Sequence, residues 1–431
     1  MTSAWRVPAR ANLRVALALL SACGSSSPSG VDGPPGDDAD AAPGALTPVM
    51  YPAGQTLSPL TPDLVAHLRA VHAMATGSAA VFAKIGDSHT VSTNYLACFG
   101  TAAVDLDGRD LAGTVAHFKA GDAAGTTPYQ RVTLAATIGW SAFQALAGSP
   151  SPLDQEVTAI HPAFATVMFG TNDIGYNRID RYGQNLATIA DTLLAQGIIP
   201  VLSTIPPRDD DTAADAQVPH YNAIARGVAQ TRGIPLVDLH RELLPLTAHG
   251  LGPDHLHLET YANGACVLTA AGLAHGNNTR NLWVLETLDR LRRTVVANEA
   301  APDADAPRLH GHGAPADPFL VDVLPFADRR DTSTFGIDAI TSYPACGPQD
   351  ERGNEVYYRI EITAPAMLHA YIIDSGADID VHLLRGKADA ASCIARGDTE
   401  VSMAVTPGTY YLVADTFAGK AGDYTIVVMT D

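Results

Sequence analysis

Ser88 is the first residue whose type and position could do chemistry. It follows an apolar run at residues 81–85 and the pair Gly86-Asp87, and it opens a segment with helical character. A serine at a strand-to-helix junction lies near unpaired backbone N–H groups and the positive end of the helix dipole, which stabilise developing negative charge. This position suits a nucleophile, although the tripeptide alone is more typical of a turn in which the serine caps a helix.

Two further side chains with acid–base chemistry, Asp254 and His257, lie three residues apart. Acyl transfer by a serine needs a neutral imidazole that accepts the hydroxyl proton and a carboxylate that fixes the imidazole tautomer, and this pair supplies both. The neighbouring His255 allows a competing interpretation, a metal site completed by His89 or His249. Because no His-rich helix or pair of cysteines accompanies these residues, we predict no metal and no organic cofactor.

Length and charge limit the classes of function. The 431 residues exceed a usual single domain and predict two domains, each large enough to bury a core. The formal net charge of -19, from 27 basic and 46 acidic residues, argues against a nucleic-acid partner and against binding anionic lipid headgroups by charge.

The N-terminal segment resembles a bacterial lipoprotein signal peptide. Three arginines precede a short apolar run at residues 15–20, and the triplet Leu-Ser-Ala before Cys23 matches the lipobox. The resemblance implies removal of residues 1–22, lipidation of Cys23 and membrane anchoring of an exported protein, at the outer membrane or cell surface rather than the inner membrane. An ordinary signal peptide cut nearby is the alternative. The apolar run is too short to span a bilayer, and we predict no transmembrane helix.

Composition divides the rest of the chain. Residues 23–50 are rich in Gly, Pro, Ser and Asp and predict a disordered tether, and residues 298–318 are rich in Ala, Pro and Asp and predict a linker. The expected folded domains are therefore residues 51–297 and 319–431.

Between the two linkers, short apolar runs alternate with amphipathic segments, which predicts βαβ units and a parallel sheet. Strands buried on both faces need helices on each side, so we predict an α/β fold, a three-layer α/β/α sandwich with a flavodoxin-like sheet. The predicted strands are residues 81–85, 165–169, 198–203 and 235–237, and the predicted helices include residues 182–196, 221–231 and one that opens at Thr61-Pro62-Asp63.

Active sites of such sheets gather beyond the carboxyl ends of the strands. Ser88 falls at one such end. The tetrapeptide Gly-Thr-Asn-Asp at residues 170–173 falls at another, directly after the strand that ends at Phe169, although alone it is also typical of a turn.

Four short blocks in this order resemble those of the SGNH hydrolase superfamily, also called GDSL lipases and esterases. They are Ile-Gly-Asp-Ser at 85–88, Ile-Gly-Trp-Ser at 138–141, Gly-Thr-Asn-Asp at 170–173 and Asp-x-x-His at 254–257. The resemblance covers about residues 78–297. One departure is that the position after the last-block aspartate, often Gly in the family, is His255.

The resemblance implies a role for each block residue. Ser88 is then the nucleophile, His257 the general base and acid, and Asp254 the residue that orients the imidazole. It also implies an oxyanion hole made of the backbone N–H groups of Ser88 and Gly139 and the side-chain amide of Asn172.

The sequence beyond residue 318 changes to a period of two, as in the alternating run at residues 355–363, which predicts strands. The segments 378–384, 407–413 and 422–428 resemble the bacterial pre-peptidase C-terminal domain, a β-sandwich of secreted enzymes. The resemblance covers about residues 319–431 and implies an accessory module rather than a second catalytic site.

Five cysteines occur, and after assignment of Cys23 to lipidation four remain. An exported protein is in a disulfide-permissive compartment, and pairing Cys98 with Cys266 and Cys346 with Cys393 keeps each bridge within one domain. Four buried free thiols are the alternative.

Together these features predict an exported, lipid-anchored serine esterase that cleaves carboxylic esters through an acyl-enzyme. Acetylated polysaccharide is the leading substrate class, because Gly-Asp-Ser-His-Thr at residues 86–90 is similar to the start of some cell-wall polysaccharide acetylesterases and Trp140 could stack on a sugar. Trp140 is equally compatible with a core position. The alternatives are a lipase or lysophospholipase of the same superfamily, and a non-catalytic surface-binding lipoprotein.

Overall fold

The computed structural model describes residues 48–101, 104–347, 349–374 and 376–431. The predicted signal peptide, the predicted lipidation site Cys23 and all but the last residues of the predicted tether lie outside the described residues. Residues from Leu46 to Asp431 form one compact unit. No helix in the described part of the chain is long and apolar enough to cross a membrane.

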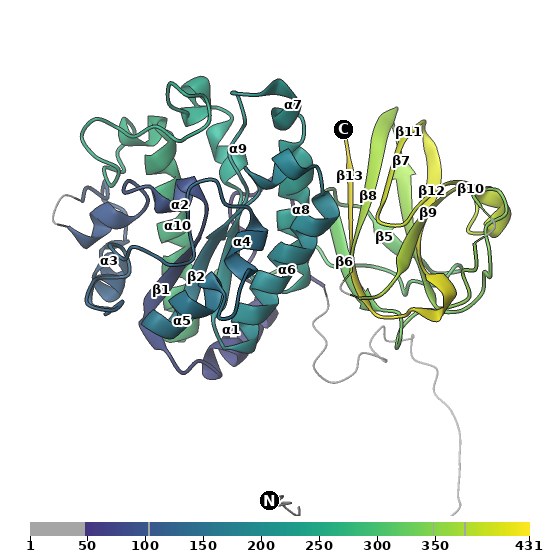
Figure 1. Ribbon diagram of the computed structural model, residues 1–431, viewed down its shortest axis with the longest axis horizontal. Coiled ribbons are helices and arrows are strands. Elements are labelled where there is room, and N and C mark those ends of the chain that lie inside the picture. Colours follow the sequence, from purple (N-terminus) through teal and green to yellow (C-terminus); the bar gives the residue numbers. More distant parts are fainter. Residues whose placement is uncertain (1–47, 102–103, 348, 375) are drawn as a thin grey trace, which may run out of the picture. The chain divides into compact units, whose positions relative to one another are not determined.

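The first part of this unit is built on a parallel sheet whose described strands have the order β1-β2-β3-β4. Strands β1 and β2 are labelled in Figure 1. Next to β1, on the side away from β2, Gly86 forms an isolated parallel bridge with Ala136. Counting this bridge as a fifth, very short strand gives the order 2-1-3-4-5 of a flavodoxin-like sheet, as predicted. The strands are β1 (Ser78–Gly86), β2 (Pro162–Met168), β3 (Ile199–Ser203) and β4 (Leu236–Val237).

Helices cover this sheet because its strands are apolar on both faces. All residues of β2 and β3 are buried, and so are those of β1 from Val81 onward. The helices are α1 (Pro62–Ala73), α2 (Ser88–Val91), α3 (Ala112–Lys119), α4 (Ala142–Leu146), α5 (Pro152–Ile160), α6 (Ile179–Ala195), α7 (Thr212–Asp215), α8 (Val218–Thr231), α9 (Leu239–Leu243) and α10 (Gly276–Leu291), with short helical turns η1 (Ala97–Gly100), η2 (Asp173–Tyr176), η3 (Thr247–Gly250), η4 (Gly272–Ala274) and η5 (Arg292–Val296). The α/β/α class predicted from the sequence is confirmed.

The C-terminal part is a β-sandwich, also as predicted. Within the described residues one sheet has the order β10-β9-β12-β7-β5 and the other β11-β8-β13-β6, and all pairs are antiparallel except β5 with β7. The strands are β5 (Phe319–Val321), β6 (Phe326–Asp331), β7 (Glu355–Ile362), β8 (Ala366–Asp374), β9 (Ile379–Arg385), β10 (Cys393–Gly397), β11 (Glu400–Val405), β12 (Gly408–Thr416) and β13 (Asp423–Thr430), with the turns η6 (Ala390–Ser392) and η7 (Phe417–Gly419).

The sandwich packs on α6 and α8 through its second sheet (Figure 1). Two helical glycines allow this close approach, because a Cβ atom at Gly183 would lie 2.7 Å from the Ile373 side chain and one at Gly227 would lie 2.6 Å from Val427. Gln230 of α8 also donates a hydrogen bond to the carbonyl of Ala327, at 2.6 Å. The apolar core of the α/β part therefore continues into the outer face of this sheet.

The segment 298–318 contacts the α/β part at several points. The carboxylate of Asp303 accepts a hydrogen bond from the backbone N–H of Leu60 at 2.6 Å and pairs with Arg290. The N–H of Met50 donates to the carbonyl of Pro307 at 2.8 Å. These contacts fix the path of the segment along the α/β part.

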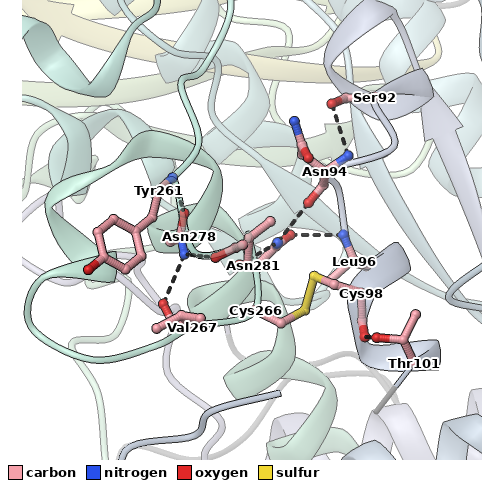
Figure 2. The surroundings of a disulfide bond; sticks show 12 residues. Ser92, Asn94, Leu96, Cys98, Thr101, Tyr261, Cys266, Val267, Asn278 and Asn281 are labelled. Atoms are coloured by element: carbon pink, nitrogen blue, oxygen red, sulfur yellow. Dashed lines mark hydrogen bonds between the residues drawn. A yellow bond between two sulfur atoms is a disulfide. The ribbon is translucent and has the colours of Figure 1, made fainter. Parts of the chain in front are cut away.

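Both predicted disulfides are confirmed, Cys98–Cys266 in the α/β part and Cys346–Cys393 in the sandwich. Figure 2 shows how α10 supports the first bridge. The side chain of Asn281 accepts from the N–H of Leu96 at 2.9 Å and donates to the carbonyl of Asn94 at 2.8 Å. One asparagine thus ties the loop before Cys98 to the helix that follows Cys266.

Candidate active site

Ser88 is positioned by a sharp turn at the carboxyl end of β1. Helix α2 begins at Ser88, and the carboxylate of Asp87 caps it by accepting a hydrogen bond from the N–H of His89 at 3.0 Å. Only glycine fits at position 86, because a Cβ there would lie 2.6 Å from the carbonyl oxygen of Met168. The turn leaves Ser88 partly exposed at the edge of the sheet.

Ser88, His257 and Asp254 form a continuous hydrogen-bonded series. The Nε2 atom of His257 lies 2.9 Å from Oγ of Ser88, and its Nδ1 atom lies 2.7 Å from Oδ2 of Asp254. The other carboxylate oxygen, Oδ1, accepts hydrogen bonds from the N–H groups of His257 and Leu256 at 3.0 and 3.2 Å. The side chains of His257 and Asp254 are 43% and 53% exposed, so the series is open to solvent.

The hydrogen bonds around Asp254 fix its charge. Partial burial raises the pKa of this carboxyl, but the bonds from the His257 ring and from the two backbone N–H groups outweigh it and lower the pKa to about 2. An ionised Asp254 accepts a hydrogen bond from the protonated Nδ1 of His257, which leaves the lone pair of Nε2 facing Ser88. This is the tautomer that a general base needs.

The structure places His257, and not His255, against the serine. His255 is exposed, and its backbone has a φ of +57°, in the left-handed region that favours glycine. Its N–H donates to the carbonyl of Gly252 at 2.9 Å and closes the turn. A positive φ gives a physical reason for the glycine often found at this position in the superfamily.

The glycine and asparagine blocks meet beside this site. Gly139 has a φ of +79° and is exposed, three residues after the bridge between Gly86 and Ala136. The side-chain nitrogen of Asn172 donates to the carbonyl of Trp140 at 2.9 Å, and an amide nitrogen carries two N–H groups, so one remains for a second acceptor. Trp140 is partly buried and packs against the core.

A buried cation lies under the site. Arg280 of α10 is almost completely buried, donates to the carbonyl of His89 at 2.6 Å and stacks over the ring of Tyr95 at 3.7 Å. The ring of His89 lies 5.2 Å from that of His257, and burial, followed by the nearby Arg280 charge, lowers the pKa of His89 well below its usual value. His89 is therefore a neutral neighbour of the imidazole that contacts Ser88.

Two buried carboxyl groups complete this layer. Burial raises the pKa of Asp87 to about 6 and that of Asp173 to about 7, although both accept backbone hydrogen bonds. Asp173 accepts from the N–H of Ala142 at 3.1 Å and so connects the strand end after β2 to α4. Sequence reasoning did not assign a role to Asp173 or Arg280; Asp173 lies within a block that it had identified, whereas no local pattern marked Arg280.

A serine, an imidazole and a carboxylate in hydrogen-bonded series at the carboxyl edge of a parallel sheet are the arrangement of serine-dependent hydrolases. Residues 85–265 match the GDSL-like Lipase/Acylhydrolase family, and this range includes Ser88, His257 and Asp254. No curated protein matches the chain.

Solved structures resemble the two parts separately. An acetylxylan esterase from Geobacillus stearothermophilus is 15% identical over 49% of this chain and 95% of its own, with a TM-score of 0.33. A GDSL-like lipase from Bacteroides thetaiotaomicron is 15% identical over 52% of this chain and 97% of its own, with a TM-score of 0.31. The pre-peptidase C-terminal domain of a collagenase from Bacillus anthracis is 15% identical over 24% of this chain and 89% of its own, with a TM-score of 0.18.

Proposed function

We propose that the protein is a serine esterase that hydrolyses carboxylic esters through an acyl-enzyme. The observation that carries the proposal is the series from Ser88 through His257 to Asp254, with each contact within hydrogen-bonding distance. His257 removes the proton of the Ser88 hydroxyl as Oγ attacks the ester carbonyl carbon. His257 then gives this proton to the leaving alcohol as the ester C–O bond breaks. In the second half of the reaction, His257 removes a proton from a water molecule as this water attacks the acyl-enzyme carbonyl carbon. His257 then returns the proton to Oγ of Ser88 as the acyl–Ser88 bond breaks, and the carboxylic acid is released.

The negative charge of each tetrahedral intermediate needs hydrogen-bond donors. In the proposed mechanism these are the N–H groups of Ser88 and Gly139 and the amide of Asn172. The Asn172 contact with Trp140 supports this role, because it fixes the amide in one orientation before the substrate arrives. A donor that is already oriented has no reorganisation cost during the reaction.

Acetylated polysaccharide is the substrate class that we propose. The exposure of the site supports this substrate class, since the side chains of His257 and Asp254 are about half exposed. A long polymer can reach a site at the surface but not the bottom of a narrow tunnel. The partly exposed Trp140 lies next to Gly139 and has a face that could stack on a sugar ring.

A lipase or lysophospholipase activity is the second candidate. Three apolar side chains close in sequence to Gly139 or Asn172 are strongly exposed: Ile138 at 73%, Phe143 at 58% and Tyr176 at 63%. Exposed apolar groups near an ester site suit a long acyl chain or a lipid surface.

Export and lipid anchoring are also part of the proposal. The signal-like segment at residues 1–22 and the lipobox before Cys23 support it, and the two disulfides fit an oxidising compartment. Mass spectrometry of membrane-extracted protein should find a mature chain that begins with lipidated Cys23. An unmodified N-terminus at another residue would contradict the anchor.

The activity is tested by offering the purified protein acetylated glycans together with short- and long-chain acyl esters. We expect release of acetate from the glycans and faster cleavage of short-chain than of long-chain esters. Ser88→Ala should abolish turnover, whereas the matched change Ser92→Ala at the end of α2 should preserve it. Preference for long acyl chains would favour the lipase, and no hydrolysis of any ester by folded protein would support the non-catalytic alternative.

A further inference from the structure

Two buried histidines and an aspartate meet where α8 packs on the sandwich. His220 comes from α8, His369 from β8, and Asp431 follows β13. The Nε2 atoms of both histidines lie 3.3 Å from the same oxygen, Oδ2 of Asp431. All three ligand-type atoms lie within 4.8 Å of one another. None of these residues belongs to the candidate active site.

The spacing matches that of ligands around one small metal ion. Zinc binds imidazole nitrogen and carboxylate oxygen at about 2.0–2.2 Å, and two ligands of a tetrahedral site are then about 3.3 Å apart. The His369 Nε2 atom is buried and makes no hydrogen bond among the described residues, so its lone pair or proton has no partner other than the nearby carboxylate. A buried imidazole nitrogen without a hydrogen bond is costly unless something else satisfies it.

The outer nitrogens of both rings are held as metal-binding histidines usually are. Nδ1 of His220 lies 2.7 Å from the hydroxyl of Tyr371, and Nδ1 of His369 lies 2.8 Å from Oγ of Ser402. The Ser402 hydroxyl donates in turn to Glu400 at 2.6 Å. Such contacts orient the rings so that both Nε2 atoms point at the same place.

The third ligand is fixed but accessible. The backbone of Asp431 exchanges hydrogen bonds with that of Met367, at 3.0 and 3.2 Å. Its side chain is 46% exposed, which leaves a path for an ion and room for a water as fourth ligand.

We propose that His220, His369 and Asp431 form a structural Zn²⁺ site that joins the hydrolase domain to the β-sandwich. Two imidazoles and one carboxylate suit Zn²⁺, whereas Ca²⁺ and Mg²⁺ prefer sites made only of oxygen. The ion stabilises the contact between α8 and the second sheet, and the proposal does not depend on the esterase reaction.

A second buried group, Glu351, Asp380 and His382, is less suited to a metal. The guanidinium of Arg396 contacts both carboxylates and already supplies a positive charge there. A divalent cation would bind beside the positive charge of Arg396, and the repulsion between the two charges disfavours binding.

The test uses the chain from Cys23 to Asp431 without a histidine tag, stripped of metal by a chelator. Titration with Zn²⁺ followed by calorimetry should give one ion per chain, and saturation should raise the Tm by a few degrees. Mg²⁺ and Ca²⁺ should do neither. Asp431→Asn and His369→Gln should each weaken Zn²⁺ binding more than about tenfold.

Two control variants locate the ion. His310→Gln changes an exposed histidine of the 298–318 segment and should leave Zn²⁺ binding unchanged. His255→Gln tests the loop beside Ser88. Zn²⁺ binding that is absent in the wild type, or that survives both ligand substitutions, would overturn the proposal; loss of binding in the His255 variant alone would place the ion at the ester site instead. Because Asp431 is exposed, its variant stays interpretable if the His369 variant fails to fold.

Discussion

Asp254 at the candidate active site and two carboxyl groups in the interior of the β-sandwich are held in opposite ways. At the site, Asp254 is about half exposed, and its hydrogen bonds lower its pKa to about 2. In the sandwich, Asp415 and Glu355 are fully buried on neighbouring strands. Burial there, with mutual repulsion, raises the pKa of Asp415 to about 9, and burial raises that of Glu355 to about 7.

This difference shows that a strongly shifted pKa does not by itself mark a catalytic site. The buried sandwich acids are near Tyr343 and Tyr357, which donate hydrogen bonds to them at 2.8 and 3.0 Å. The candidate active site is marked instead by its contacts, because Ser88 contacts His257 and His257 contacts Asp254.

His257→Ala should abolish most turnover, with a loss of about 10⁴–10⁶ in kcat, because the serine then has no base. His255→Ala should retain much of it, since His255 is exposed and His257 is the imidazole that contacts Ser88. Steady-state kinetics with a short-chain ester measures both. Equal losses would mean that both imidazoles share the role, and a greater loss in the His255 variant would reverse the assignment.

Asn172→Ala should lower kcat by about 10²–10³, because the intermediate loses one oxyanion donor, while KM changes far less. The same change removes the bond to Trp140, so a modest fall in Tm is also expected. Kinetics and a thermal melt on the same preparation separate the two effects. A folded variant with normal kcat would show that Asn172 is only structural.

Removing either disulfide should destabilise the protein, by about 2–4 kcal/mol in typical cases. Cys98–Cys266 encloses a sequence separation of 168 residues and Cys346–Cys393 one of 47, so the loop-entropy model makes the first about 1 kcal/mol more stabilising. Unfolding by denaturant of the two double Cys→Ala variants gives the comparison. A larger loss from the sandwich bridge would mean that local packing outweighs chain entropy.

Asp173→Asn and Asp415→Asn should give different pH profiles of stability. An unfolded carboxyl loses its proton near pH 4, whereas Asp173 keeps it to about pH 7 and Asp415 to about pH 9, so the wild type loses stability as pH rises through each window. The Tm gain of Asp173→Asn over wild type should therefore grow from pH 4 and level off near pH 7. That of Asp415→Asn should continue to grow to about pH 9.

The Tm of the wild type and of each variant is measured by thermal melts in buffers that cover the pH range of the two carboxyl groups. Levelling at the same pH in both variants would show that the pKa values of Asp173 and Asp415 do not differ. No growth with pH in either variant would mean that both carboxyl groups are solvated.

Much of the fold could be predicted because its elements have strong local patterns. The four helix residues Leu64, Val65, Leu68 and Val71 share a face, and all are buried in α1. The strand predicted at 165–169 is β2, displaced by up to three residues. The bridge at Ala136 could not be predicted, because one paired residue has no periodicity.

The site was only partly predictable for a similar reason. Ser88, His257 and Asp254 occur in recognisable blocks, and the structure brings them together; their catalytic roles stay predictions. Arg280 was not found, because it lies far along the chain on α10 and reaches the site only through the fold. The group of His220, His369 and Asp431 likewise exists only once two domains have packed.

Reaction with a fluorophosphonate tests directly whether Ser88 is a nucleophile, because this reagent phosphonylates a serine only when a neighbouring base activates it. We predict one probe per chain, mapped by peptide mass spectrometry to Ser88, with no labelling of Ser88→Ala and strongly slowed labelling of His257→Ala. Folded wild-type protein that stays unlabelled, or a probe found on another serine, would contradict the assignment of Ser88 as nucleophile.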